Sequence, residues 1–270
     1  MSDFLALHHS DDGPLLLPNP WDGGSARLLE SLGFKALATT SSGFAATLGR
    51  VDYSVSRDEA LAHSAQIVEA TSLPVSADLE NGFADDPADV AETVRLARET
   101  GLAGCSIEDA TGREDGPIYC LEHAAARVEA AAAAAHSGPD RFVLTARAEN
   151  HLYPGAGDLA DTIARLQAYE AAGADVLYAP GLSTIEDIRE VVSSVGLPVN
   201  VLAHGHAPPV AELAEAGVRR ISVGGAFAFA ALGAVVEAAR ELLDEGTYGF
   251  SARARTGAKA ARAAFAQPTT

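Results

Sequence analysis

The sequence lacks the features that would direct the chain into a membrane or out of the cell. Its 270 residues contain no apolar run long enough to cross a bilayer. The first residues, which include Asp3, Asp11 and Asp12, do not follow the basic-then-apolar order of a secretory signal. We therefore expect a cytoplasmic protein that does not use a membrane as a partner.

Positive charge is scarce. The chain has 19 Lys and Arg against 37 Asp and Glu, which gives a formal net charge of -18 at pH 7. Binding to a nucleic-acid backbone or to an anionic membrane surface requires clustered Lys and Arg, so neither is an expected partner. A small anionic substrate is compatible with this charge if a metal ion or a local arginine reverses the field at the site.

Cysteine is also rare. The chain has two, Cys105 and Cys120. Their spacing matches neither a zinc site nor a Cys-Xaa-Xaa-Cys motif, and two cysteines do not make a disulfide framework. Both are interpreted as buried or incidental thiols.

What the chain does contain is a repeated unit: a short apolar run, a polar or glycine-bearing loop, and an Ala/Leu/Glu/Arg-rich stretch of helical length. The predicted strands are 15–17, 36–39, 75–78, 104–108, 142–147, 176–178, 199–203 and 220–223. The predicted helices are 23–32, 57–70, 87–99, 121–135, 159–171, 184–194, 208–216 and 227–243. Eight such units predict an α/β protein with a closed (β/α)₈ (TIM) barrel, and an open doubly wound sheet is the alternative.

We expect one domain over residues 1–270, with the barrel at about 15–243 and a helical tail at 244–270. The basic stretch 247–265 predicts an additional C-terminal helix, and the last four residues are expected to fray.

Polar residues gather where the predicted strands end, which is the active-site face of a (β/α)₈ barrel. Side chains alternate along a strand, so Asp78 and Glu80 are predicted to share a face at the third strand. Glu108 ends the fourth strand, and Arg147 and Glu149 end the fifth. Such an acid cluster requires a cation, and carboxylates suit Mg²⁺, with Mn²⁺ also possible.

Two alternatives accompany this interpretation. Asp78 and Glu80 are equally consistent with solvated acids in a loop, and Arg147 with a structural ion pair to Glu149 or Glu80. If a metal ion neutralises the acids, Arg147 is instead free to bind a substrate carboxylate or phosphonate. Thr40, Ser41 and Asn200, at other strand ends, are candidate substrate-binding residues.

Two long loops follow the predicted strands. The loop from 41 to 57 contains a further acid, Asp52. The loop from 109 to 119 is polar and contains glycine, so it is either a mobile lid over the barrel mouth or an ordinary surface loop.

Five segments together resemble the isocitrate lyase/phosphoenolpyruvate mutase superfamily. They are 19–26 (NPWDGGSA), 40–44 (TSSGF), 76–82 (SADLENG), 106–109 (SIED) and 145–149 (TARAE). The resemblance runs from about residue 15 to residue 243 in the expected order. It implies a (β/α)₈ barrel whose eighth helix is exchanged between subunits of a homo-oligomer, either a dimer or a tetramer.

The resemblance also implies residue roles. Asp78 would bind Mg²⁺ directly, and Glu80, Glu108 and the less well aligned Asp52 would hold it through water. Ser42 and Gly43 would donate hydrogen bonds to the 2-oxo acid end of a substrate, and Arg147 would bind its other end. Arg147, Ser42, Gly43 and Glu149 are the candidate catalytic residues. The shared chemistry makes or breaks a bond next to a pyruvate-like enolate.

Several family motifs are missing. Isocitrate and methylisocitrate lyases carry Lys-Xaa-Cys-Gly-His in the loop after Glu108, whereas this chain has ATGREDGP at 110–117. The mutases carry Lys and Asn in that loop and a His after the sixth strand, where this chain has Tyr178-Ala179-Pro180. The leading hypothesis is therefore a Mg²⁺-dependent lyase that cleaves a C–C bond of an oxaloacetate- or malate-like diacid. The alternatives are a phosphonopyruvate or carboxyphosphonoenolpyruvate mutase and a barrel that binds a metabolite without catalysis.

Overall fold

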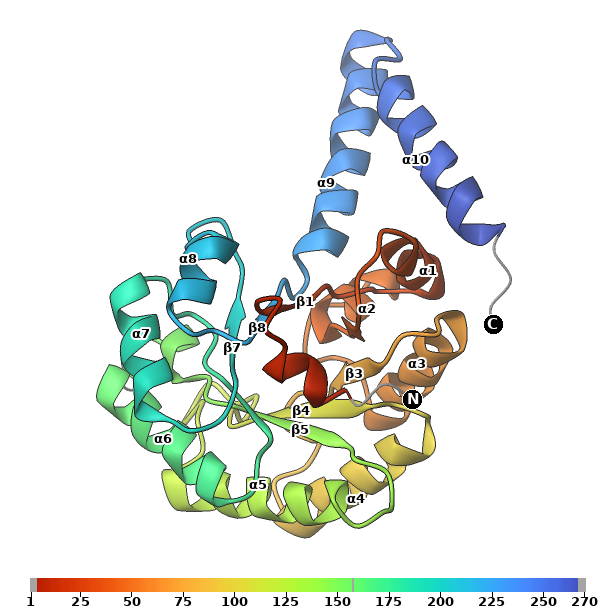
Figure 1. The fold of residues 1–270 in the computed structure, drawn as a ribbon. Coiled ribbons are helices and arrows are strands. Elements are labelled where there is room, and N and C mark those ends of the chain that lie inside the picture. The colour runs from red at the N-terminus through yellow and green to blue at the C-terminus, as the bar shows by residue number, and fades with distance from the viewer. Residues whose placement is uncertain (1–3, 157, 267–270) are drawn as a thin grey trace.

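Eight parallel strands form a nearly closed barrel surrounded by helices (Figure 1). The structure is a computed structural model that describes residues 4–156 and 158–266. The strands are β1 (Leu15–Leu17), β2 (Leu37–Ala38), β3 (Val75–Asp78), β4 (Gly104–Glu108), β5 (Val143–Arg147), β6 (Val176–Tyr178), β7 (Val199–Leu202) and β8 (Arg220–Ser222). They are paired in the order β1-β8-β7-β6-β5-β4-β3-β2. The predicted (β/α)₈ barrel is confirmed, and the open-sheet alternative is wrong.

Helices alternate with the strands. They are α1 (Gly23–Ser31), α2 (Ser41–Thr47), α3 (Arg57–Ala70), α4 (Pro87–Glu99), α5 (Leu121–Ala135), α6 (Leu159–Ala171), α7 (Ile185–Ser194), α8 (Val210–Glu215), α9 (Ala226–Arg240) and α10 (Ser251–Phe265). Short 3₁₀ turns occupy Ala6–His9 and Asn150–Leu152, and a π-helical turn occupies Glu241–Glu245. No helix within residues 4–156 and 158–266 is long and apolar enough to cross a membrane.

The barrel interior has an apolar end and a polar end. Phe4, from the segment before β1, packs with Leu15, Leu17, Val143 and Val176 near the starts of the strands. The outward-facing side chains, such as Ile107 and Leu144, pack against the helices in the main core. Polar side chains are left at the carboxyl ends of the strands, so the fold concentrates them at one face.

The region after β2 differs from the prediction. Residues 41–57 were expected to form a loop, but α2 occupies Ser41–Thr47 at its start. Thr40 caps this helix through its side-chain oxygen, which accepts a hydrogen bond from the Gly43 N–H at 3.3 Å. Thr, Ser and Gly are typical of helix starts, so the capping pattern was present in the sequence.

The helix after β8 leaves the barrel. In Figure 1, α9 projects away from the strands and α10 folds back beside it. Along α9 the large apolar side chains Phe229, Leu232, Val235 and Val236 are at least 46% exposed. The additional C-terminal helix is therefore present as α10, and the exchange of α9 between subunits stays a prediction. Residues 267–270, which were expected to fray, lie outside the described residues.

Candidate active site

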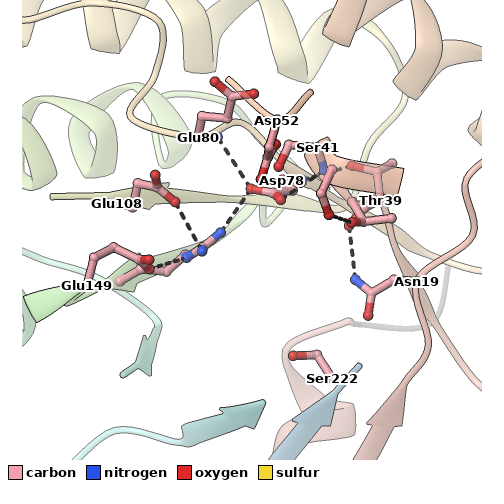
Figure 2. A network of polar contacts seen from close by, with 12 residues as sticks. Asn19, Thr39, Ser41, Asp52, Asp78, Glu80, Glu108, Glu149 and Ser222 are labelled. Carbon is pink, nitrogen blue, oxygen red and sulfur yellow. Dashed lines mark hydrogen bonds and ion pairs between the residues drawn. The ribbon is translucent and has the colours of Figure 1, made fainter. Parts of the chain in front are cut away.

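Arg147 contacts the carboxylates of Asp78, Glu108 and Glu149, three acids that Figure 2 shows around one point. Its Nη1 lies 2.9 Å from Asp78 Oδ1, its Nη2 lies 3.1 Å from Glu108 Oε2, and its Nε lies 2.8 Å from Glu149 Oε1. Glu108 pairs with Arg147 in the ladder between β4 and β5, which fixes their relative positions. The ion-pair alternative was therefore right about Glu149, but the second and third partners are Asp78 and Glu108 rather than Glu80.

Asp78 is held by its own neighbours. Its N–H donates to Thr39 Oγ1 at 2.9 Å, and its Oδ2 accepts from the Ser41 N–H at 3.1 Å. The Ser41 N–H belongs to the first turn of α2, where unpaired N–H groups favour a carboxylate. The backbone of Asp78 is thus held by Thr39, which follows β2, and its side chain is oriented by α2 and Arg147.

Glu80 reaches the site by a route that the sequence argument did not predict. β3 ends at Asp78, and Glu80 follows it in the left-handed region with φ 49°. Strand alternation therefore does not place this side chain, and that part of the prediction is wrong. Burial and the charges of Asp78 and Asp52 raise the pKa of Glu80 to about 8. Among the described residues it forms no ion pair, so it is the acid most in need of a cation.

Asp52 and Tyr53 come from the segment between α2 and α3. Loss of hydration and the nearby charge of Asp78 raise the pKa of Asp52, and a hydrogen bond from Ser41 opposes this shift. Tyr53, with φ 59°, donates a hydrogen bond from its hydroxyl to Glu108 Oε1. This segment therefore brings one acid and one phenol to the same cluster.

A cavity of about 170 Å³ opens beside these groups. The predicted residues that line it are Thr40, Ser41, Ser42, Asp52, Asp78 and Arg147. Gly43, Glu149 and Asn200 do not line it. Gly43 uses its N–H within the α2 cap, Glu149 lies behind Arg147, and the Asn200 amide donates to Ser222 Oγ at 3.0 Å. Of the predicted metal ligands, Glu80 and Glu108 also lie outside this lining.

A second network holds the strand ends that carry the acids. Asp109, which is 2% exposed, accepts hydrogen bonds from Tyr169 Oη at 2.5 Å, Arg165 Nη1 at 3.0 Å and the Glu149 N–H at 2.7 Å. Arg127 donates to the carbonyls of Asn81 and Ala84, which belong to the segment following Glu80. These buried contacts tie β4, β5 and the turn after β3 to the helices behind them.

The acids do not form a ready-made metal cage. Among residues 4–156 and 158–266, no three His, Cys, Asp or Glu side chains lie close enough to ligate one ion together. Mg²⁺ usually keeps several waters and takes only one or two carboxylates directly, so the residues present still fit such an ion. The raised pKa of Glu80 beside Asp78 and Asp52 supports this fit, because a divalent cation would relieve the repulsion between these acids.

The loop 109–119 is folded on itself. Ala110 and Ile118 form an antiparallel bridge, and the Thr111 N–H donates to the Pro117 carbonyl at 2.7 Å. An open groove of about 750 Å³ lies between this loop, Tyr53 and Glu80. Arg113 of the loop bonds to Asp85 across the groove at 2.9 Å. The loop thus borders this groove, and its role as a lid stays a prediction.

Sequence reasoning missed several residues of the site. Tyr53 follows Asp52 directly, and Asp109 follows Glu108, so both were adjacent to predicted acids. Asn19 belongs to the 19–26 segment, and its amide donates to the Thr39 carbonyl at 3.0 Å (Figure 2). Arg220, the first residue of β8, was also missed, because a charged residue at the start of a short strand does not by itself indicate a site. Both cysteines lie outside the site, with Cys105 buried and Cys120 exposed.

Comparison with known proteins places the chain. The sequence profile of the family described as phosphoenolpyruvate phosphomutase matches residues 4–243. A solved structure from Burkholderia cenocepacia J2315, described as a lyase or mutase, is 53% identical with a TM-score of 0.94, and the match covers 98% of this chain and 96% of that one. A 2,3-dimethylmalate lyase of the PEP mutase/isocitrate lyase superfamily is 30% identical with a TM-score of 0.80 (91% and 87% covered). An oxaloacetate acetylhydrolase bound to its product oxalate is 28% identical with a TM-score of 0.82 (92% and 88% covered). The chain therefore belongs to the phosphoenolpyruvate phosphomutase family, within the isocitrate lyase/PEP mutase superfamily.

Proposed function

We propose that the protein is a Mg²⁺-dependent lyase that cleaves a C–C bond of a small 2-oxo or 2-hydroxy diacid through an enolate. The observation that carries the proposal is the Arg147 cluster: three carboxylates, from the ends of β3 and β4 and from just after β5, surround one guanidinium beside a small polar cavity. Relatives that act on oxaloacetate and on a substituted malate support the substrate class.

The metal would be held by Asp78 directly and by Glu80, Glu108 and Asp52 through water, with Mn²⁺ as a possible substitute. When bound, such an ion supplies positive charge that stabilises the negative charge developing on an enolate oxygen. The donor set consists of carboxylate oxygens, which suit a hard cation.

The chain's own residues bind and orient the substrate. The hydroxyls of Thr40, Ser41 and Ser42 line the cavity and are available to one end of the diacid. If a metal ion binds Asp78, the Arg147 nitrogen that now contacts Asp78 becomes available to a substrate carboxylate. Glu149, which is 1% exposed, holds Arg147 in place from behind. Gly43 fixes the start of α2, since a Cβ there would lie 2.5 Å from Thr40 Cγ2.

The positions of the two cysteines favour this reaction over a cleavage that uses a thiol acid. Burial raises the pKa of the Cys105 thiol, and Cys120 lies at the start of α5 outside the cavity. The phosphonate alternative would require other groups in the loop 109–119, which contains Arg113 but neither Lys nor Asn.

The test is a panel of 2-oxo acids, malates and phosphonopyruvate, incubated with purified protein and Mg²⁺. We expect pyruvate or another enolate-derived product from at least one diacid. The variant Asp78→Asn is expected to lose at least about 100-fold in kcat/KM while keeping its fold, because one lost electrostatic contact in a catalytic site typically costs that much. Asp140→Asn, at an exposed site, serves as the matched control.

Three outcomes are informative. Turnover of phosphonopyruvate alone would support the mutase alternative. No turnover, together with metabolite binding that Asp78→Asn and metal removal leave unchanged, would support a barrel that binds without catalysis. Turnover of a diacid that survives both chelation and Asp78→Asn would contradict the metal-dependent mechanism.

We further propose that the protein works as a dimer or tetramer of identical chains. Support comes from the apolar side chains of α9 and from Leu16, the outward residue of β1, which is 41% exposed. In a (β/α)₈ barrel the helix after β8 covers β8 and β1, and α9 does not lie there in the single chain (Figure 1). A second copy of α9 would cover this surface.

A further inference from the structure

Arg220 is a buried cation without a buried anion. It begins β8, is 3% exposed, and pairs in the ladders with Leu15 of β1 and Asn200 of β7. No carboxylate of the described residues forms an ion pair with it, and its one hydrogen bond runs from Nη1 to Thr145 Oγ1 at 2.9 Å. Its buried Nε has no partner among the described residues. A guanidinium in this condition is costly unless something neutralises it.

Another buried arginine, Arg127, shows the contrast. Arg127 also lacks a carboxylate partner, but it donates to the backbone carbonyls of Asn81, Ala84 and Glu108 and lies 4.2 Å from the Tyr119 ring centre. Those contacts explain Arg127 as a support of the polypeptide chain. Arg220 has a single hydroxyl in their place, so a structural role does not account for its charge.

Nothing below Arg220 supplies negative charge. His8, from the segment before β1, is buried, and its Nδ1 lies 3.0 Å from the Phe4 carbonyl. Burial and the charge of Arg220 lower the pKa of His8 to about 3, so this imidazole is neutral. Burial lowers the pKa of Arg220 to about 10; Tyr178 opposes this shift and the charge of Arg147 adds to it, and at neutral pH the guanidinium keeps its proton.

Arg220 lines the same cavity as Arg147, at its deeper end. It starts β8, whereas Ser222 and Gly224 follow it toward the mouth, and all three line the cavity. Arg147 is already surrounded by three carboxylates. Of the two cavity arginines, Arg220 is therefore the one whose charge an entering anion would neutralise.

A second polar group beside Arg220 is also incompletely bonded. Asn200 is buried, and its Oδ1 has no partner among the described residues, while its amide nitrogen bonds to Ser222 Oγ. A hydroxyl both donates and accepts, so the amide turned by 180° keeps the bond to Ser222 and presents an N–H instead. Arg220 and Asn200 are then two neighbouring donors on paired strands.

We propose that Arg220 binds an anionic group of carboxylate size at the floor of the cavity. The group is either the inward-pointing carboxylate of a diacid substrate, which rests on the proposed function, or a small inorganic anion that resides there. In the first case Arg220 selects diacids over monoacids, because a monoacid of the same length leaves the guanidinium buried and unpaired.

The test compares succinate with butyrate, which differ by one carboxylate and which the proposed reaction does not cleave. Calorimetric titration in Mg²⁺ is expected to show succinate binding at least about tenfold tighter than butyrate to the native protein. Arg220→Met is expected to lose this preference: its affinity for succinate should fall at least tenfold, and its affinity for butyrate less than twofold. Arg220→Lys should retain part of the preference, and Arg219→Met, which changes the exposed neighbour, should retain all of it.

A parallel measurement identifies an inorganic source. An inorganic, resident anion predicts two results. Chloride, compared with gluconate, raises the melting temperature of the native protein but not that of Arg220→Met, and succinate and butyrate bind to the native protein with equal affinity. The proposal is overturned if folded Arg220→Met matches the native protein in both measurements. If Arg220→Met does not fold, the native protein decides: equal affinity for the two acids together with no response to chloride would overturn it. All these readouts are independent of turnover, so a failed activity screen would leave them interpretable.

Discussion

At the scale of residues, the charge of Arg147 is shared by Asp78, Glu108 and Glu149. Breaking a buried ion pair by removing one partner is strongly destabilising, because the remaining charge stays buried and uncompensated. Here, removal of the Arg147 guanidinium would leave three neighbouring carboxylates without a positively charged partner. The cluster is therefore sensitive to Arg147 and comparatively tolerant of any one carboxylate.

Arg147→Met is expected to lower the free energy of unfolding by about 3 kcal/mol at pH 7.5 in the absence of metal. The loss should be smaller at pH 5.5, where the stranded carboxylates take up protons more easily. Urea unfolding at the two pH values measures this difference. Arg95→Met, which removes exposed helix pairs with Glu92 and Glu99, is the control and should cost less than about 1 kcal/mol. Equal losses for the two variants would contradict the prediction.

Glu80 predicts a pH dependence of opposite sign to that of an ordinary paired carboxylate. Its pKa rises from 4.5 to about 8 on folding. Below the unfolded-state pKa both states hold the proton. Between the two values the folded state retains it and the unfolded state does not, so stability falls as pH rises, by up to about 1.4 kcal/mol per pH unit. Metal-free protein should therefore be less stable at pH 8.5 than at pH 5.5.

Glu80→Gln should flatten this slope, and Glu92→Gln, at an exposed carboxylate, should leave it unchanged. Urea unfolding in chelator-containing buffer from pH 5 to pH 9 is the measurement. A slope that is the same in native protein and Glu80→Gln would mean that another group causes the pH dependence.

The site was predictable where strand ends decide it. Asp78, Glu108 and Arg147 end three adjacent strands, and the structure brings them into contact. Glu80 and Tyr53 depend on left-handed backbone turns, which alternation along a strand does not reveal. Arg220 depends on which groups meet across the barrel, and no local pattern contains that information.

At the scale of elements, the position of α9 is the feature that the single chain does not explain. Exposed apolar surface is normally buried against a partner, and α9 carries it along its length. α10 returns to the barrel instead, where the Phe265 ring lies 5.9 Å from the Arg27 guanidinium carbon. The pair α9 and α10 thus forms a projecting arm in which the C-terminal end of α10 contacts α1.

Val235→Asp is expected to shift the protein toward smaller assemblies, because it places a charge on the apolar side of this arm. Val235 is 64% exposed in the single chain, so the substitution should leave the barrel itself folded. Light scattering coupled to size-exclusion chromatography measures the mass, and circular dichroism measures the fold. Val235→Leu keeps the apolar surface and should match the native mass. A native protein that is monomeric at micromolar concentration would contradict the proposed oligomer.

Most elements were predicted within one or two residues because their signals are local. Glycines follow four of the predicted helices, and all four have positive φ between 85° and 98°, as is typical of helix ends: Gly33, Gly101, Gly173 and Gly217. The short helix α2 was missed because its seven residues are too few for an apolar periodicity. The direction of α9 could not be predicted from local signals, since an apolar helix has the same sequence pattern whether it packs on its own barrel or on that of another chain.

At the scale of the whole molecule, the barrel follows from the eightfold alternation of strand and helix, which leaves a closed parallel sheet as the compact solution. The closure is uneven around the circumference. Seven of the junctions between neighbouring strands are ladders, whereas β1 and β2 are joined by a hydrogen bond from the Ala38 N–H to the Pro18 carbonyl at 3.1 Å. No sequence pattern indicated where the weak junction would be.

Asn19 compensates at this junction with its side chain. Its amide nitrogen donates to the Thr39 carbonyl, and its Oδ1 accepts from the Val223 N–H, both at 3.0 Å. One amide group therefore links the segments that follow β1, β2 and β8. Asn19→Ala is expected to cost about 2 kcal/mol in unfolding free energy, since it leaves one buried and one partly buried backbone group unpaired. Asn81→Ala, whose side chain accepts one partly buried N–H, should cost less.

The junction between β1 and β2 is also where we expect the barrel to open locally most easily. Amide hydrogens at Ala38 and Val223 are expected to exchange with solvent faster than those within the β4–β5 ladder, and Asn19→Ala should accelerate them further. The Thr39 hydroxyl that receives the Asp78 N–H lies on the same junction. Opening of the barrel wall and loosening of Asp78 are thus expected to be one event, so that any ligand which fixes Asp78 slows hydrogen exchange at Ala38.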